Sequence, residues 1–276
     1  MAKPSLREEK RLWRKGYKFV ACLDEAGVGP LAGPVVAAAV IINKISNIKY
    51  QKYKSNIKKL NNTAIKQFNS LNIRDSKKLS PRKREEFYKI LKKHPAIGWG
   101  VGIVSEKIID KINIKNAAEL AMEKALKKLE QVRPAGQKMK NQPRRLKESG
   151  LRSPDASSGE APTYVGAPKA SEKLKISHLI IDGNHINSKK LKAMPYKLIV
   201  KADEKVFSCA AASIIAKVTR DRIMVKYHKK YPHYRFDIHK GYCTKLHLAR
   251  LKKFGPSPIH RKSFEPVRWE ILNPKH

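Results

Sequence analysis

The segment Lys18-Phe-Val-Ala-Cys-Leu-Asp24 is almost wholly apolar and continues into the Gly/Pro-rich turn Glu25-Ala-Gly-Val-Gly-Pro30. A short apolar run bounded by a turn is typical of a buried strand. The next apolar run, residues 35–43, follows this turn closely enough to be the hairpin partner of the first strand. We therefore expect the sheet to begin with an antiparallel pair.

Beyond this hairpin, strand and helix patterns alternate. Further strands are predicted at residues 96–105, 177–182 and 197–201, and helices at residues 105–131 and at 207 to about 229. Antiparallel strands followed by β-α-β units indicate a mixed sheet with flanking helices. The sequence thus predicts an α/β fold.

The charge of the chain is strongly positive. Its 61 Lys and Arg exceed its 23 Asp and Glu, giving +38 at pH 7, which favours a polyanionic partner. Three separated cysteines offer no disulfide framework, and the first 17 residues show no secretory signal. The longest apolar run is too short to cross a membrane. We therefore expect a cytoplasmic protein without membrane contact.

Composition divides the chain into three parts. Residues 1–16 form a basic N-terminal extension, residues 17–230 the main domain, and residues 231–276 a basic C-terminal cap over one end of the sheet. Two insertions interrupt the main domain. Residues of about 44–73 have seven Lys, six Asn and no acid, and residues of about 133–175 are rich in Pro, Gly, Ser, Lys and Arg. We expect the second insertion to be disordered.

Acids follow two of the predicted strands. Asp24 and Glu25 are adjacent, and both reach one site only if the strand ends or bulges there, which Gly27 and Gly29 permit. Asp182 precedes a glycine at the end of a buried strand, where α/β proteins place their sites. Carboxylate oxygens suit Mg²⁺ or Mn²⁺. The alternative is that both are ordinary acidic turns.

Asp221 lies on the apolar stripe of the last predicted helix. The stripe has steps of four and three residues and consists of Phe207, Ala211, Ile214, Val218, Asp221 and Val225. A carboxylate on a buried face is costly unless it is paired or binds a metal. Lys217, one turn earlier, is the alternative partner.

Two basic segments could hold nucleic acid. Residues 75–80, which include Ser76 and Lys77, offer hydroxyl and ammonium groups suited to phosphate. Residues 239–245 place the aromatic ring of Tyr242 between glycine and basic residues, which is a plausible stacking platform. The alternative is that both are solvated charged surfaces.

Taken together, these motifs resemble ribonuclease HII, the bacterial type 2 ribonuclease H. The matching segments occur in the family's order over most of residues 17–268: Asp24-Glu25-Ala26-Gly27 to Gly33-Pro34, Asp75-Ser76-Lys77-Lys78-Leu79, Ile181-Asp182-Gly183, residues 210–222, His239-Lys240-Gly241-Tyr242, residues 255–261 and Ser263-Phe264. The resemblance implies a ribonuclease-H-like fold, with a five-stranded mixed sheet flanked by helices and a C-terminal helical cap.

The resemblance also implies an activity. Asp24, Glu25, Asp182 and Asp221 would hold two Mg²⁺ or Mn²⁺ ions for in-line hydrolysis that leaves a 3′-hydroxyl and a 5′-phosphate. The substrates would be RNA/DNA hybrids and duplex DNA with embedded ribonucleotides. The backbone of Gly27, Val28 and Gly29, together with Tyr242, would read the 2′-hydroxyl. Ser76 and Lys77 would hold phosphates, and the protein would act as a monomer.

Departures from the family pattern leave alternatives open. Val28 replaces an arginine that usually stands between the two glycines, and Cys243, His233 and Arg235 replace small residues. One alternative is therefore a general hybrid nuclease without preference for single ribonucleotides. The other is a non-catalytic nucleic-acid-binding protein, which the four acids disfavour. Ribonuclease HIII is disfavoured because no extra N-terminal platform domain is evident.

Overall fold

A five-stranded sheet forms the centre of the molecule. The computed structural model describes residues 4–42, 79–94, 96–131 and 174–273. The strands lie in the order β3-β2-β1-β4-β5 and comprise β1 (Val20–Ala26), β2 (Val35–Ile42), β3 (Ile97–Val104), β4 (His178–Asp182) and β5 (Tyr196–Ile199). β1 pairs antiparallel with β2 and parallel with β4. The predicted mixed sheet is confirmed, and β1 runs two residues further than predicted, so that Asp24 and Glu25 lie inside it.

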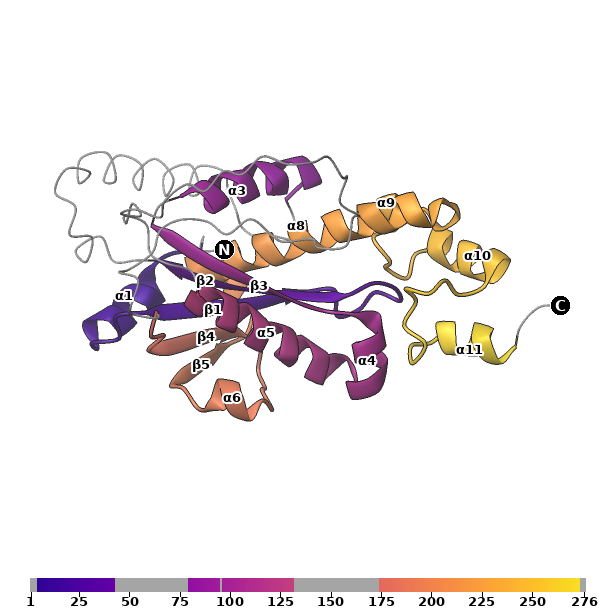
Figure 1. Cartoon of the computed structure of the whole chain (residues 1–276). Helices are drawn as coiled ribbons and strands as arrows, with labels where there is room; N and C mark the ends of the chain where they lie inside the picture. Colours follow the sequence, from indigo (N-terminus) through magenta and orange to yellow (C-terminus); the bar gives the residue numbers. More distant parts are fainter. Residues whose placement is uncertain (1–3, 43–78, 95, 132–173, 274–276) are drawn as a thin grey trace, which may run out of the picture.

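Helices cover both faces of this sheet (Figure 1). α3 (Pro81–Lys93) and α8 (Phe207–Lys230) lie on one face, and α4 (Glu106–Ile112) and α5 (Ile114–Gln131) on the other. The sequence predicted one helix over residues 105–131. The structure divides it at Asn113, which has a φ of 65°, because asparagine tolerates the left-handed region better than most residues.

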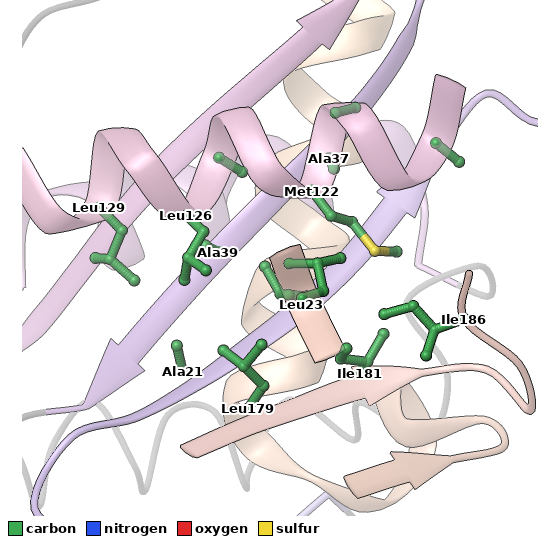
Figure 2. Close-up of a cluster of buried hydrophobic side chains, with 14 of the residues drawn as sticks. Ala21, Leu23, Ala37, Ala39, Met122, Leu126, Leu129, Leu179, Ile181 and Ile186 are labelled. Atoms are coloured by element: carbon green, nitrogen blue, oxygen red, sulfur yellow. The ribbon is translucent and has the colours of Figure 1, made fainter. Parts of the chain in front are cut away.

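The core is built on strand alternation. Leu23 and Ile181 point to α5, where they meet Met122 and Leu126 (Figure 2). The neighbours of Leu23 in β1, Cys22 and Asp24, therefore point to the opposite face of the sheet, which α8 covers. α5 also lies very close to β3, since a Cβ at Gly102 of β3 would overlap the backbone of α5.

The N-terminal segment contains a helix, α1 (Arg7–Arg14), that the sequence reasoning did not predict. Its Glu9 is buried and accepts hydrogen bonds from the amide and the hydroxyl of Ser208, at 3.0 and 2.6 Å. Ser208 lies in the first turn of α8, whose N-cap residue Val206 has no capping side chain. α1 is thus docked on the start of α8.

The C-terminal residues form the predicted helical cap at one end of the sheet (Figure 1). It consists of a 3₁₀ turn (Pro232–Tyr234), α9 (Phe236–His239), α10 (Lys245–Phe254) and α11 (Val267–Leu272). Two short helices, α6 (Lys189–Lys192) and α7 (Ala202–Lys205), flank β5.

The first predicted insertion and most of the second lie outside the described residues. Leu174, near the end of the range predicted for the second insertion, is buried in the core. Within the described residues, no helix combines the length and the apolar character needed to span a membrane.

Candidate active site

Three carboxylates meet at the carboxyl ends of the parallel strands. Asp24 of β1 and Asp182 of β4 lie on neighbouring strands, whose register pairs Leu23 with Ile181. Asp203 of α7 completes the group. One carboxylate oxygen from each lies within 4.8 Å of the others. Strand alternation and parallel pairing thus bring together Asp24 and Asp182, as the sequence suggested, while Asp203 joins them from the segment after β5.

Asp203 was missed in the sequence reasoning. α7 begins at Ala202, whose amide donates a 2.8 Å hydrogen bond to Oδ1 of Asp182. This bond ties the start of α7 to the end of β4, and Asp203 is 2% exposed. The signal was present in the sequence, because Asp203 closely follows β5 just as Asp182 ends β4, and these two strands are parallel neighbours.

Burial and neighbouring negative charges disfavour the ionised form of Asp24 in this three-carboxylate group. Burial, followed by the negative charges of Glu25 and Asp182, raises the pKa of Asp24 well above its usual value, while a hydrogen bond from Ser213 opposes the shift. A divalent cation among these oxygens would offset both the burial and the repulsion. The donor set is entirely oxygen, which fits Mg²⁺ or Mn²⁺ rather than a thiolate- or imidazole-binding metal.

Glu25 lies beside this group without being part of it. Its amide donates a 2.8 Å hydrogen bond to Oδ1 of Asp24, and its charge contributes to the raised pKa of Asp24. On the regular strand its side chain alternates to the α5 face. The bulge considered for this strand would be needed to turn both acids fully into one site.

Asp221 also lies outside the three-carboxylate group. Its Oδ2 is 3.8 Å from Nη2 of Arg84 on α3, so its charged partner is Arg84 rather than Lys217. The Lys217 ammonium instead lies 5.6 Å from the centre of the Tyr242 ring. Val225, the next member of the predicted stripe, is 39% exposed, so the stripe leaves the core near Asp221.

Residues 27–34 form a tightly packed loop next to the carboxylates. Gly27 has a φ of 95°, and a Cβ there would overlap the side chain of Arg220, so glycine is required. Arg220 is 1% exposed and donates to the carbonyls of Ala32, Pro34 and Lys240 at 3.0–3.1 Å. Its three bonds join the loop to the C-terminal cap.

Tyr242 lies against the same loop. The amide of Leu31 donates a 2.8 Å bond to the carbonyl of Gly241, and a Cβ at Gly241 would crowd the carbonyl of Ala32. Tyr242 is partly exposed, as are Val28 and Gly29. The structure therefore places Gly27, Val28, Gly29 and Tyr242 on neighbouring segments, whereas Ser76 and Lys77 lie outside the described residues.

Three buried histidines support the Tyr242 segment, where the sequence suggested a stacking platform or a solvated basic surface but no buried histidines. The amide of Gly241 donates to Nδ1 of His239, and that of Ser257 to Nδ1 of His260. Nε2 of His260 lies 3.0 Å from Nε2 of His247, whose Nδ1 is 2.9 Å from the carbonyl of Tyr242. These contacts fix the tautomers of the neutral rings. Nε2–H of His260 donates to Nε2 of His247, and Nδ1–H of His247 donates to the carbonyl of Tyr242.

Burial is the main cause that lowers the pKa of these rings, to about 4 for His247 and about 3 for His260. Both are therefore neutral at physiological pH.

Known proteins are similar to this chain over most of its length. The family model described as "Ribonuclease HII" matches residues 21–152 and 169–267. Ribonuclease HII of Acholeplasma laidlawii is 39% identical over 263 residues, which cover 95% of each chain. Ribonuclease HII of Alkaliphilus metalliredigens is 36% identical over 259 residues, covering 94% of this chain and 96% of the relative.

Solved structures share the fold. Ribonuclease H2 from Pyrococcus horikoshii OT3 superposes with a TM-score of 0.55 at 24% identity, over 93% of this chain and all of that chain (100%). Bst-RNase HIII, solved in complex with Mn²⁺, gives a TM-score of 0.54 at 13% identity, over 94% of this chain and 71% of that one.

Proposed function

Because the chain belongs to the ribonuclease HII family and is thus a metal-dependent endoribonuclease, we propose that it cuts RNA/DNA hybrids and duplex DNA at embedded ribonucleotides. The proposed reaction is in-line hydrolysis that leaves a 3′-hydroxyl and a 5′-phosphate. The observation that carries the proposal is the grouping of Asp24, Asp182 and Asp203 within 4.8 Å. Such a group needs cations, and the phosphodiester backbone needs the charge stabilisation that cations give.

We assign the metal-holding role to Asp24, Asp182 and Asp203, with Glu25 beside them. Two Mg²⁺ or Mn²⁺ ions, when bound, would supply Lewis-acid stabilisation of the phosphate and a lowered pKa for the attacking water. Ser213 supports the ionised form of Asp24 through its hydrogen bond. The role predicted for Asp221 stays a prediction, since its charged partner among the described residues is Arg84.

The loop of residues 27–34 and Tyr242 would read the substrate. The loop directly follows β1, the strand that carries Asp24, and the Tyr242 ring has the cations of Lys217 and Arg220 at 5.6 and 5.5 Å. A partly exposed ring among cations suits a sugar or base next to phosphate. The net charge of +38 suits a duplex.

A general hybrid nuclease without preference for single ribonucleotides is the second candidate. Val28 is 39% exposed and apolar, so this position offers no charged donor to a phosphate. The two candidates differ only in the preferred substrate, and both use the same carboxylates.

The proposal extends to the setting of the enzyme. We place it in the cytoplasm as a monomer. Its three cysteines are all free in the structure, which suits a reducing compartment.

The deciding experiment is cleavage of a duplex that contains one ribonucleotide, beside a long hybrid and an all-DNA duplex, with Mg²⁺ and with Mn²⁺. We expect cuts at the single ribonucleotide, no cuts in all-DNA duplex, and no activity in EDTA. Mapping the product ends tests the predicted 3′-hydroxyl. Cleavage of the long hybrid alone would favour the general nuclease, and no cleavage of either substrate with both metals would contradict the proposal.

A further inference from the structure

A second buried arginine lies beneath the loop of residues 27–34. Arg261 is 0% exposed and comes from the C-terminal cap. Its guanidinium donates to the carbonyls of Gly27 at 2.6 Å, Val28 at 2.8 Å and Gly33 at 3.0 Å. Three of its five N–H groups thus hold a single loop that lies beside the carboxylates.

These bonds fix two successive peptide planes. The peptide bonds that follow Gly27 and Val28 are both trans. In a trans peptide the N–H points opposite to the C=O. Because both carbonyls point at Arg261, the amides of Val28 and Gly29 point away from it.

That outward direction is open. Val28 is 39% exposed, and a Cβ at Gly29 would meet nothing within 4 Å. Within the described parts of the chain, no backbone carbonyl accepts a hydrogen bond from the amide of Val28 or Gly29. Arg261 therefore presents two neighbouring donors on the exposed side of the loop.

Arg261 makes no salt bridge within the described residues, although the charges of Asp110 and Glu106 favour its charged form. Burial, and then the charge of Arg220, lower its pKa to about 9, so that it remains charged at neutral pH. A buried cation without a counterion is costly. An anionic strand bound over the loop would add negative charge near Arg261 and stabilise its buried cation further.

We propose that Arg261 is a positioning residue, which aims the amides of Val28 and Gly29 at a ribose 2′-hydroxyl and thereby sets the discrimination between RNA and DNA. This inference rests on the proposed function, since it requires a ribonucleotide substrate. It also explains how Val28 can stand in this loop, because the donors belong to the backbone and their direction is set by Arg261.

The test compares the affinity of each protein for an all-DNA duplex and for the same duplex with one ribonucleotide, in EDTA so that no strand is cut. Arg261→Lys keeps the charge and removes the planar fork of donors. We expect the preference for the ribonucleotide to fall by roughly tenfold, with unchanged affinity for DNA. Leu129→Ala, in the core on the α5 face, is the control for lost stability, and its preference should equal that of the wild type.

An unchanged preference in Arg261→Lys would overturn the inference, and so would an equal loss of affinity for both duplexes, which would mark a phosphate anchor. If Arg261→Lys does not fold, the wild-type protein decides. The amide resonances of Val28 and Gly29 should shift with the ribonucleotide duplex and not with the DNA duplex, and equal shifts would overturn the inference. If the wild-type protein binds the two duplexes equally, the ribonucleotide substrate of the proposed function is itself contradicted.

Discussion

At the scale of single residues, the site depends on acids that are held close together against their mutual repulsion. Asp24 is 5% exposed and Asp203 is 2% exposed, and burial and neighbouring charges raise the pKa of Asp24. Such an arrangement costs stability in the protein alone and is offset when cations bind. The acids are therefore placed for function at the expense of the fold.

Val28→Arg should raise kcat/KM on a single embedded ribonucleotide by roughly tenfold. The position is exposed, so a guanidinium can reach solvent and a neighbouring phosphate, and a charge-assisted hydrogen bond contributes about 1.5–3 kcal/mol. Steady-state kinetics on this substrate and on a long hybrid measure the effect. Val28→Gln is the control, because it adds a polar side chain without charge. An equal gain on both substrates would mark a general anchor, and no gain would show that the phosphate is already held.

At the scale of elements, the start of α8 depends on a carboxylate from another helix. Val206 cannot cap the helix, and Glu9 of α1 accepts from the amide of Ser208 instead. This hydrogen bond also joins the N-terminal segment to α8, the helix that covers the active-site face of the sheet. α1 therefore contributes to the stability of the domain.

Glu9→Ala should lower the free energy of unfolding by about 1–3 kcal/mol, because it leaves the Ser208 amide without its acceptor. Denaturant unfolding gives the value. Glu8→Ala is the matched control on the same helix. Glu8 is more exposed and pairs with Lys197 at 2.9 Å, and surface pairs contribute less than about 1 kcal/mol. If both variants lose the same free energy of unfolding, the hydrogen bond from Ser208 to Glu9 adds no more stability than a surface ion pair.

The C-terminal cap should lose stability in acid. The pKa of His247 in the folded protein is about 4, below its unfolded value of about 6.5, so the unfolded state binds more protons between these values. The stability that neutral His247 contributes is therefore fully present above pH 6.5 and is lost as the pH falls toward 4. Between pH 7 and pH 5 the loss is about 2 kcal/mol. Asp24, with a raised pKa, acts in the opposite direction.

Denaturant unfolding at both pH values, for the wild type and His247→Gln, isolates this histidine. The variant should be less stable at pH 7, and its stability should fall by about 2 kcal/mol less on acidification. Equal pH dependence in the two proteins would mean that His247 is not held neutral.

The sequence predicted the elements that have a clear apolar pattern and missed those that have none. The strands were foreseen from short apolar runs bounded by turns, and α8 from the helical spacing of its apolar residues. α1 and α3 were missed because charged residues dominate both, although the Ser80-Pro81 start of α3 is a recognisable cap. The break at Asn113 needs a left-handed backbone, which helical periodicity does not reveal.

The site residues at the ends of strands could be predicted from the sequence, and those that depend on contacts between distant segments could not. Asp24 and Asp182 follow from strand ends, and Asp203 could have been found by the same rule. Asp221 was favoured by helical spacing, and its role in the site stays a prediction. The roles of Arg220 and Arg261 depend on contacts between distant segments, which one sequence does not contain.

At the scale of the whole molecule, positive charge is spread along the chain while the carboxylates are concentrated at one end of two strands. Residues 133–172 contain eight Lys and Arg and four Asp and Glu, so that 8 − 4 gives +4. Charge of this kind contributes to duplex affinity through counterion release and has no part in the chemical step.

Replacing residues 133–172 with a Gly/Ser segment of equal length should weaken duplex binding and flatten its salt dependence. The log–log slope of affinity against salt falls by roughly one for every phosphate that the protein no longer neutralises. Leu174 is retained because it is buried in the core. The single-turnover rate at saturating substrate should be unchanged. A collapse of that rate would show that these residues belong to the catalytic domain.

The central claim is that Asp24, Asp182 and Asp203 hold the catalytic cations. Its most direct test is calorimetric titration of Mn²⁺ into the wild type, Asp203→Asn and Asp221→Asn, with cleavage of the single-ribonucleotide duplex measured on the same samples. We predict that Asp203→Asn remains folded, loses Mn²⁺ binding and loses at least about a hundredfold in rate, or about 2.7 kcal/mol in the barrier. Normal Mn²⁺ binding and cleavage by folded Asp203→Asn, with both lost in Asp221→Asn, would contradict the account.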